Sequence, residues 1–356
     1  MTEQSTTADN PTATIDTNQQ RATGSDMTSS SSRGIEFYFQ WAVVVIGVVG
    51  TATNVLILYA LVASKQHKKH VLIFHQNVLD LCSSFLLTIT YLLKLCNFYL
   101  SGSPGYWLCV LILSENLVWS VIIASNVNLM IVTIDRYLKV VHSVWSKKTL
   151  RKWMIYSAMA FAWISGLVTS FPTTFTTSDV IGGVCFALMV WKSRVAQMAF
   201  GIWYFMFDCL ILLILFIFCY WRILVVIRRQ SKVMATHSGP GPSTAQTQSH
   251  QMKTSVIKTM ILVSVFHTIS SLPLNIYYLL LNINANLSLL DGGYYALVFT
   301  SFLYFSSNPF IYATKFDPVK RILLDLIPCV KTPVQPIESI EIASHRRATV
   351  KVETRN

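Results

Sequence analysis

Long apolar runs, separated by short polar segments, make up most of the chain. A helix needs about 20 mainly apolar residues to cross the hydrocarbon core of a bilayer, and seven segments of the sequence meet this requirement. Lipid offers no partners to backbone N–H and C=O groups, so a helix satisfies them where an open sheet does not. The pattern predicts an all-α membrane protein, a seven-transmembrane helix bundle. The predicted helices are residues 36–62, 71–99, 107–137, 153–173, 196–227, 255–282 and 292–314.

Polar segments flank and interrupt this bundle. Residues 1–34 are rich in Ser, Thr, Asn and Gln, so they cannot bury a core and are predicted to be disordered. No apolar run follows Met1, and we therefore expect no cleaved signal peptide. A second disordered stretch is predicted around His237–His250, which contains Gly-Pro repeats, and a third is the tail 329–356. One helical domain remains, residues 35–328.

A short amphipathic segment, residues 316–327, follows the seventh predicted helix. Lys320 and Arg321 fall on its polar side, which is typical of a helix that lies in the membrane interface. Cys329 comes directly after this segment and is a candidate for palmitoylation. An unmodified cysteine is the alternative.

Composition and charge support a membrane protein and give it an orientation. Hydrophobic residues make up 53% of the chain and charged residues only 12%, about half the share in soluble proteins. Basic residues cluster at alternate helix ends on one face, which the positive-inside rule makes cytoplasmic, with the N-terminus extracellular. The basic residues assigned to the other face are Arg21, Arg33, Lys94, Lys192 and Arg194. The net charge of +12 is thus a juxtamembrane feature, and nucleic-acid binding is not expected because no basic folded domain would present it.

Short motifs occur at definite depths within the predicted helices. The third helix ends in Asp135-Arg136-Tyr137, the seventh in Asn308-Pro309-Phe310-Ile311-Tyr312, and the second carries Asp80. Further single matches are Gly50, Asn54, Trp163 and Leu272-Pro273. Each motif alone is weak. In this order and at these depths, the chain resembles the rhodopsin-like (class A) G-protein-coupled receptors over about residues 36–328.

The resemblance implies a multi-pass plasma-membrane receptor that binds an extracellular ligand and activates a heterotrimeric G protein. Arrestin and a receptor kinase are further expected partners. In the family the arginine corresponding to Arg136 contacts the G protein, and the tyrosines corresponding to Tyr220 and Tyr312 move in to support it. Asp135 is expected to pair with Arg136. Many relatives add an acidic residue at the foot of helix six, where this chain has Lys253, so we expect a weak lock between helices.

A polar cluster is predicted in the middle of the bundle. A charged Asp80 inside the membrane is costly unless it faces a polar interior, and Asn308 and Ser125 are expected to share that interior. The resemblance implies a sodium ion at Asp80; a water-filled polar knot without an ion is the alternative. No other metal or cofactor is expected. Pro309 and Pro273 are expected to kink their helices and allow one half to pivot.

The chain departs from the family at positions that couple the ligand pocket to the cytoplasmic end. Ser271 stands where relatives have a tryptophan, and His267 where they have a phenylalanine. Leu212 lies near the place of a proline in helix five, so a kink is expected to be lost there. The switch must therefore be built differently or be absent. We expect His267 to be a hydrogen-bonded core residue rather than a pH sensor.

Cysteine positions suggest one disulfide. The family joins the outer end of helix three to the following loop, here Cys109 to Cys185, and Cys96 is the rival partner. Cys109 lies about two residues early relative to Arg136, which implies an irregularity in that helix. The remaining cysteines within helices are expected to be small core residues; they are Cys82, Cys209 and Cys219.

The expected ligand site lies between the outer halves of the helices. The candidate lining residues are Glu115, Val118, Trp119, Asp208, Asn275, Tyr278 and Phe302. Val118 replaces the aspartate of amine receptors, and no lysine occurs in 292–314 to hold retinal, where Phe302 takes its place. Lys94 is a candidate partner for Glu115. Asp208 has no obvious basic partner, so a cationic group on the ligand, a polar partner in the bundle and a protonated acid stay open.

These features favour a receptor over other classes of protein. A hairpin expected within Phe175–Val184 would form a lid of the kind common in peptide receptors, so a peptide ligand is favoured. The alternative, based on Ser271 and Lys253, is a ligand-independent, constitutively active or non-signalling scavenger-like protein. An enzyme is not expected, because no nucleophile–base set or metal-ligand spacing occurs. A transporter using the membrane carboxylates would not need two receptor motifs on one face.

Overall fold

The computed structural model describes residues 13–187, 191–236, 244–283, 287, 292–315 and 317–325. This part of the chain is almost entirely helical. The helices are α1 (Ala13–Ala63), α2 (Gln66–Lys69), α3 (Val71–Leu95), α4 (Gly102–Leu108), α5 (Asn116–Val141), α6 (Ser143–Thr149), α7 (Lys152–Thr177), α8 (Arg194–Tyr204), α9 (Ile211–Thr236), α10 (Thr244–Ile283), α11 (Gly292–Lys315) and α12 (Asp317–Asp325). The other elements are the π-helical segments η1 (Cys109–Leu113) and η2 (Phe205–Leu210) and the strands β1 (Asp179–Ile181) and β2 (Val184–Phe186).

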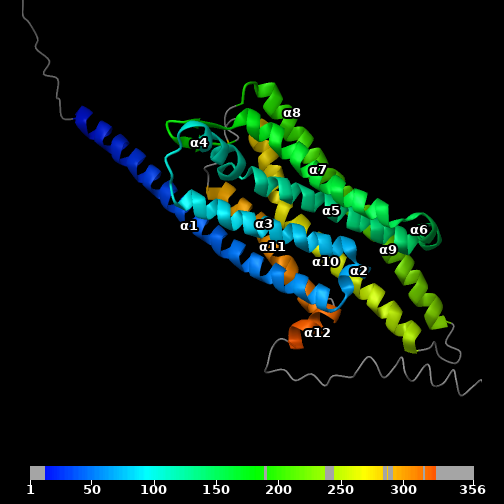
Figure 1. Cartoon of the computed structure of the whole chain (residues 1–356). Coiled ribbons are helices and arrows are strands. Elements are labelled where there is room, and N and C mark those ends of the chain that lie inside the picture. Colours follow the sequence, from blue (N-terminus) through cyan, green and yellow to red (C-terminus); the bar gives the residue numbers. More distant parts are fainter. Residues whose placement is uncertain are drawn as a thin grey trace, which may run out of the picture.

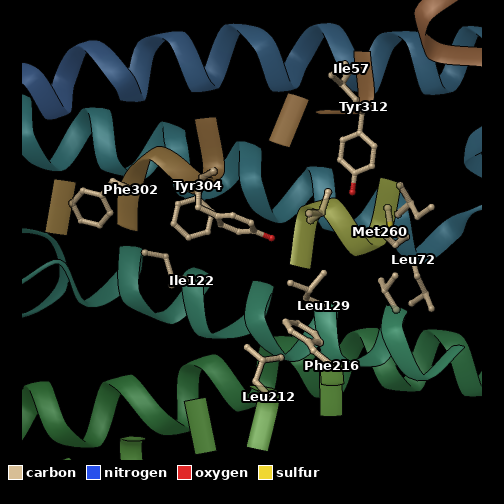
Figure 2. Packing of buried hydrophobic residues seen from close by; sticks show 14 of the residues in the cluster. Ile57, Leu72, Ile122, Leu129, Leu212, Phe216, Met260, Phe302, Tyr304 and Tyr312 are labelled. Carbon is tan, nitrogen blue, oxygen red and sulfur yellow. The ribbon is translucent and has the colours of Figure 1, made fainter. Parts of the chain in front are cut away.

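The long helices lie side by side in one bundle (Figure 1). Helix α3 packs against α1 and α5, α5 also contacts α7 and α9, and α11 closes the bundle between α10 and α1. Apolar side chains fill the interior. Figure 2 shows Leu129, Phe216, Met260 and Tyr304 converging on it from four different helices.

Six helical segments are long and apolar enough to cross a membrane. They are Gly34–Ala63, Val71–Leu95, Gly102–Val141, Lys152–Thr177, Arg194–Gln230 and Thr254–Ile283, and each overlaps one of the first six predicted helices. Large apolar side chains on these segments, such as Val45, Phe161 and Ile217, are more than half exposed. Such a surface suits lipid tails, which make no demand for polar groups.

Helix α11 takes the seventh place in the bundle and coincides with the predicted helix 292–314. Helix α12 lies where the short amphipathic helix is expected at 316–327. That α11 crosses the membrane and that α12 lies in its interface stay predictions. Cys329 and the tail 329–356 fall outside the described residues.

Two helices begin earlier than their apolar runs. Helix α1 starts at Ala13, inside the segment 1–34 predicted to be disordered, and α10 starts at Thr244, inside the second such stretch. Each start lies two residues after a proline, Pro11 and Pro242. No proline separates these starts from the apolar spans, so each helix can extend outward from the span once it is nucleated.

The helix that carries Arg136 is interrupted near its start. It runs from α4 through the π-helical turn η1, and Glu115 then takes the left-handed conformation, with φ of 62°, before α5 begins. This confirms the irregularity predicted from the early position of Cys109. A second π-helical turn, η2, ends two residues before Leu212, so this helix is irregular although it has no proline there.

Candidate functional site

A disulfide marks one end of the bundle, which we call the disulfide end. Cys109 in η1 is bonded to Cys185 in β2, with Cα atoms 5.4 Å apart, which confirms the predicted pairing. Cys96, the rival, is exposed and is among the free cysteines of the described part. The bond anchors the hairpin of β1 and β2 to the start of the third membrane segment.

The hairpin has a two-residue turn of Gly182 and Gly183, both with positive φ. The backbone N–H of Leu100 donates to the carbonyl of Gly183 at 3.0 Å. A Cβ atom at Gly183 would lie 2.1 Å from the ring of Tyr99, so this turn needs glycine both for its φ and for the close approach. A hairpin is therefore present, but it spans Asp179–Phe186 rather than Phe175–Val184, because α7 continues to Thr177; it lies against α4 and η1.

A cavity opens among α5, α7, α8, η2, α10 and α11 in the half of the bundle nearest the disulfide. Its volume is about 90 Å³, which is room for a few water-sized groups, since one water needs roughly 10–15 Å³ by the same measure. Four of the predicted ligand residues line it: Trp119, Asp208, Asn275 and Tyr278.

Three predicted ligand residues do not line this cavity. Val118 and Phe302 are at most 1% exposed and pack within the apolar core. Glu115 is taken up by neighbours: it pairs with Lys94, as predicted, and accepts hydrogen bonds from the Tyr91 hydroxyl at 2.8 Å and the Trp119 indole at 3.1 Å. The left-handed turn at Glu115 directs its side chain toward α3, and so its role in this structure is to join two helices.

Asp208 has a polar partner in the bundle. The amide of Asn126 donates to both carboxylate oxygens, at 3.0 and 3.1 Å. No ion pair with Asp208 occurs among the described residues. The Asn126 Oδ1 atom is buried and has no hydrogen-bond partner within the described part, so the cavity wall offers a carboxylate and a free amide oxygen side by side. Asn126 was not expected from the sequence, where it reads as one polar residue in an apolar helix.

Ser271 and His267 lie at the base of the cavity. The Ser271 hydroxyl donates to the carbonyl of His267 at 2.7 Å, and its side chain leaves space rather than filling it. His267 is 3% exposed, and its ring packs edge-on against Tyr304, with centroids 4.7 Å apart. His267 is a core residue as expected, but its hydrogen bonding is weak: Nε2 lies 3.4 Å from the Ser271 hydroxyl, and Nδ1 is buried with no partner in the described part.

The predicted polar cluster around Asp80 is assembled. Asp80 is fully buried, Asn308 donates to its Oδ2 atom at 2.8 Å, and Ser125 donates to Oδ1 at 3.2 Å. Gln76, which the sequence did not single out, donates to Oδ1 at 3.1 Å. It lies one helical turn before Asp80, so the helical spacing could have pointed to it.

The atoms around this carboxylate do not fit a sodium ion. A hard cation binds oxygen lone pairs, whereas Gln76, Ser125 and Asn308 each direct a hydrogen at Asp80. Of the two interpretations left open by the sequence, this donor set suits the polar knot without an ion.

Arg136 lies at the other end of the bundle, which we call the Arg136 end. Its Nε atom is 3.8 Å from Asp135, but Lys139 is closer to the same carboxylate, at 2.8 Å. The Arg136 Nη2 atom instead meets His70 Nδ1 at 3.3 Å. Asp135 and Arg136 therefore form the expected pair, but the Asp135 carboxylate also binds Lys139. His70 is a second partner of Arg136 that the sequence did not reveal.

His70 lies between α2 and α3 and is well suited to accept this hydrogen bond. Burial, followed by the positive charges of Arg136 and Lys139, lowers the pKa of His70 to about 4. The imidazole is thus neutral near pH 7, with a lone pair for the Arg136 guanidinium. The side chain of Lys253 lies outside the described part, and the foot of helix six is left to prediction.

The two predicted switch tyrosines both lie in the core. The Tyr220 hydroxyl contacts Thr133 at 3.1 Å and Ser264 at 2.8 Å, and so joins α9 to α5 and α10. Tyr312 is 2% exposed and lies beside Pro309 in α11. Tyr137, next to Arg136, packs its ring on Phe218 of α9 with centroids 5.7 Å apart.

Comparison with protein families agrees with this geometry. The model of the 7 transmembrane receptor (rhodopsin family) matches residues 53–312, which is well over half of the chain. The match includes Asp80, Arg136 and the segment from Asn308 to Tyr312. A search of curated proteins finds no match to this chain. The protein is therefore a multi-pass membrane protein and belongs to the rhodopsin family of seven-transmembrane receptors.

Proposed function

We propose that this receptor binds an extracellular ligand at the disulfide end and activates a heterotrimeric G protein at the Arg136 end. In this arrangement α11 is the seventh membrane span, α12 lies in the interface, and the N-terminus is outside. The observation that carries the proposal is a largely apolar cavity with a few polar groups at one end of the helix bundle and a loosely held Arg136 at the other. The basic residues flanking the Arg136 end support its cytoplasmic position.

We propose a ligand that places a basic, hydrogen-bond-donating group beside Asp208. The carboxylate accepts hydrogen bonds from Asn126 and Tyr204 but has no cationic partner among the described residues, and the adjacent Asn126 Oδ1 atom accepts nothing within that part. Both acceptors would be satisfied by an ammonium or guanidinium group. The small cavity suits one side chain rather than a folded peptide, and the β1–β2 hairpin at the same end of the bundle offers a surface for the rest of a peptide ligand.

Arg136→Ala tests G-protein coupling. We expect it to abolish nucleotide exchange on the G protein while surface expression stays close to wild type, since Arg136 contributes little to the apolar core. Arg151→Ala, at an exposed residue just before α7, is the matched control and should signal normally. Wild-type exchange rates in the Arg136 variant would exclude the proposed coupling role.

Asp208→Asn tests the ligand chemistry. A library of basic peptides and small amines is screened on the wild type by nucleotide exchange, and each hit is then measured on the variant. Loss of a buried charge pair should weaken potency at least tenfold, which corresponds to about 1.4 kcal/mol. Asp179→Asn, an exposed carboxylate on β1, is the control. Hits that lack a basic group and ignore Asp208→Asn would contradict this ligand class.

A ligand-independent receptor is the second candidate. Ser271 favours it, because a small hydroxyl lines the cavity at the α10 position where relatives have a tryptophan that a ligand would have to move. Nucleotide exchange without ligand, relative to mock-transfected cells, separates the possibilities. Strong basal exchange indicates a constitutively active receptor, and none with or without ligand indicates a scavenger-like protein.

A further inference from the structure

We infer that the side-chain amide of Gln76 is a built-in occupant of the space beside Asp80 and that it makes the receptor insensitive to sodium at this site. The amide donates to the Asp80 carboxylate at 3.1 Å and also to the Ser125 hydroxyl. Gln76 is 1% exposed, and Asp80 and Ser125 are fully buried. A tethered donor therefore stands where a cation would have to approach.

The orientation of this amide is fixed by a chain of hydrogen bonds that begins on α7. The indole N–H of Trp163 can only donate, and it meets His75 Nε2 at 3.0 Å. His75 must therefore be neutral, with its hydrogen on Nδ1, because a second ring hydrogen at Nε2 would face the indole N–H. The Nδ1 hydrogen is then donated to Asn128 Oδ1, which lies 2.9 Å away.

The orientations of the Asn128 and Gln76 amides, up to the contact with Asp80, follow in the same way. With its oxygen accepting from His75, Asn128 uses its amide hydrogens as donors, to Gln76 Oε1 at 2.8 Å and to the Leu72 carbonyl at 3.3 Å. Gln76 is left with its own NH₂ group pointing at Asp80 and Ser125. The reverse orientation of Gln76 would place its NH₂ against the NH₂ of Asn128 and its oxygen against the carboxylate.

A sodium ion would have to break this arrangement. It would need to displace the Gln76 amide, leaving both the amide and the facing Asn128 donor buried without partners, a cost that buried polar groups seldom recover. On the Oδ2 side, Asn308 donates to the carboxylate at 2.8 Å. The Asn308 Oδ1 atom and the nearby Tyr304 hydroxyl have no other partners in the described part. The hydroxyl can donate to this oxygen, directly or through one water, so neither group needs a cation.

The relay also has a structural consequence. The hydrogen bonds run from Trp163 on α7 to His75 on α3, then to Asn128 on α5 and back to Gln76 on α3. Gln76 contacts the Asp80 carboxylate, which also accepts a hydrogen bond from Asn308 on α11. Four helices thus depend on one directional network, and the Asp80 carboxylate is stabilised by hydrogen bonds from uncharged donors of the protein. The inference concerns ion binding alone, and it stands whether or not the proposed ligand class is correct.

Thermal unfolding of the purified full-length receptor tests the inference without any signalling assay. The melting temperature is compared in NaCl and in choline chloride, each at about 0.15 M, a physiological ionic strength. A ligand that binds only the folded state raises the melting temperature. We expect no sodium-specific shift for the wild type. Gln76→Ala, which opens the space beside the carboxylate, should gain a sodium-specific rise of about 2 °C or more.

Control variants test whether the sodium-specific rise in melting temperature arises at Asp80. The gain should vanish in the double variant Gln76→Ala/Asp80→Asn, and it should be absent in Gln40→Ala, which removes a glutamine bonded to Glu36 on α1. Gln76→Ser replaces Gln76→Ala if the latter fails to fold. A sodium-specific shift in the wild type that Asp80→Asn removes would overturn the inference. So would the lack of any sodium response in both Gln76 variants, because Gln76 would then not be standing in a cation's place.

Discussion

Arg136 is held by two side chains that come from different parts of the chain. Asp135 is its sequence neighbour but is more closely engaged by Lys139, whereas His70 approaches from the segment before α3. Among the described residues, His70, between α2 and α3, is the side chain from outside α5 that forms a hydrogen bond with Arg136. Lys253, at the expected foot of helix six, is basic and adds no acidic partner. We therefore expect His70 to help hold the inactive arrangement.

His70→Ala should raise basal nucleotide exchange several-fold, because the Arg136 guanidinium loses a hydrogen-bond acceptor and is freer to meet the G protein. His67→Ala is the matched control: this histidine is three residues earlier on α2, and its Nδ1 atom has no hydrogen-bond partner within the described residues. Equal basal exchange for the two variants, normalised to surface receptor, would refute this role.

The same contact sets a pH dependence that checks the assignment. The pKa of His70 is about 4 in the folded protein and near 6.5 in an unfolded chain. The unfolded state therefore takes up the proton first, and stability falls as pH drops from 6.5 toward 4. At pH 6.5 and above the contact is unaffected. The melting temperature of His70→Ala should decline less steeply than that of the wild type between pH 6.5 and 5.

The residues that the sequence identified and those it missed differ in a physical way. A carboxylate in an apolar helix must have polar partners, so Asp80, Ser125 and Asn308 could be predicted together. Gln76 and Asn126 are uncharged amides, which membrane helices tolerate in many contexts, and no charge cost draws attention to them. Their roles depend on side-chain direction and on neighbours from other helices, which only the packed structure supplies.

At the scale of elements, the irregular start of the third membrane segment decides which residues reach the cavity. An α-helix turns about 100° per residue, so one extra residue moves every later side chain to another face. The position of Cys109 predicts that an irregularity exists, but not that it combines η1 with a left-handed Glu115. Trp119 lines the cavity as the sequence predicts, whereas Glu115 turns toward α3 and Val118 packs in the apolar core.

Cys185→Ala should reduce both stability and surface expression. The bond to Cys109 closes a long stretch of chain and holds the hairpin against η1, and loss of a native disulfide typically costs about 2–5 kcal/mol in small secreted domains. Cys96→Ala is the control and should behave as wild type. Surface staining and the melting temperature provide the measurements, and a Cys185→Ala variant indistinguishable from Cys96→Ala would contradict the prediction.

At the scale of the whole molecule, the base of the cavity is the link between the two ends. His267 packs against Tyr304 of α11 and Phe216 of α9, and both belong to the apolar core that extends to Tyr220 and Tyr312. Ser271 lies one turn above His267 and faces the cavity. A change in volume at this point can therefore alter how α10 packs against its neighbours.

Ser271→Trp should lower basal nucleotide exchange. An indole at this position fills the base of the cavity and adds contacts that α10 must break before it moves, because interiors are closely packed and respond to added volume. A shift of about 1.4 kcal/mol toward the inactive state lowers the active fraction about tenfold. Unliganded wild-type receptor should accordingly signal above mock-transfected cells, and Ser271→Trp should bring this output down.

The control for this substitution is Ile269→Trp, which adds the same indole to α10 at a position that is 66% exposed on the outer surface of the bundle. It should leave basal exchange unchanged, since its new side chain meets lipid rather than the cavity. Overpacking is the competing effect, as added volume in a filled site costs about 1–3 kcal/mol and would show as reduced surface expression. Basal exchange is therefore compared at equal surface receptor. Basal nucleotide exchange by the wild type at the level of mock-transfected cells would show that the small side chain of Ser271 does not destabilise the inactive state.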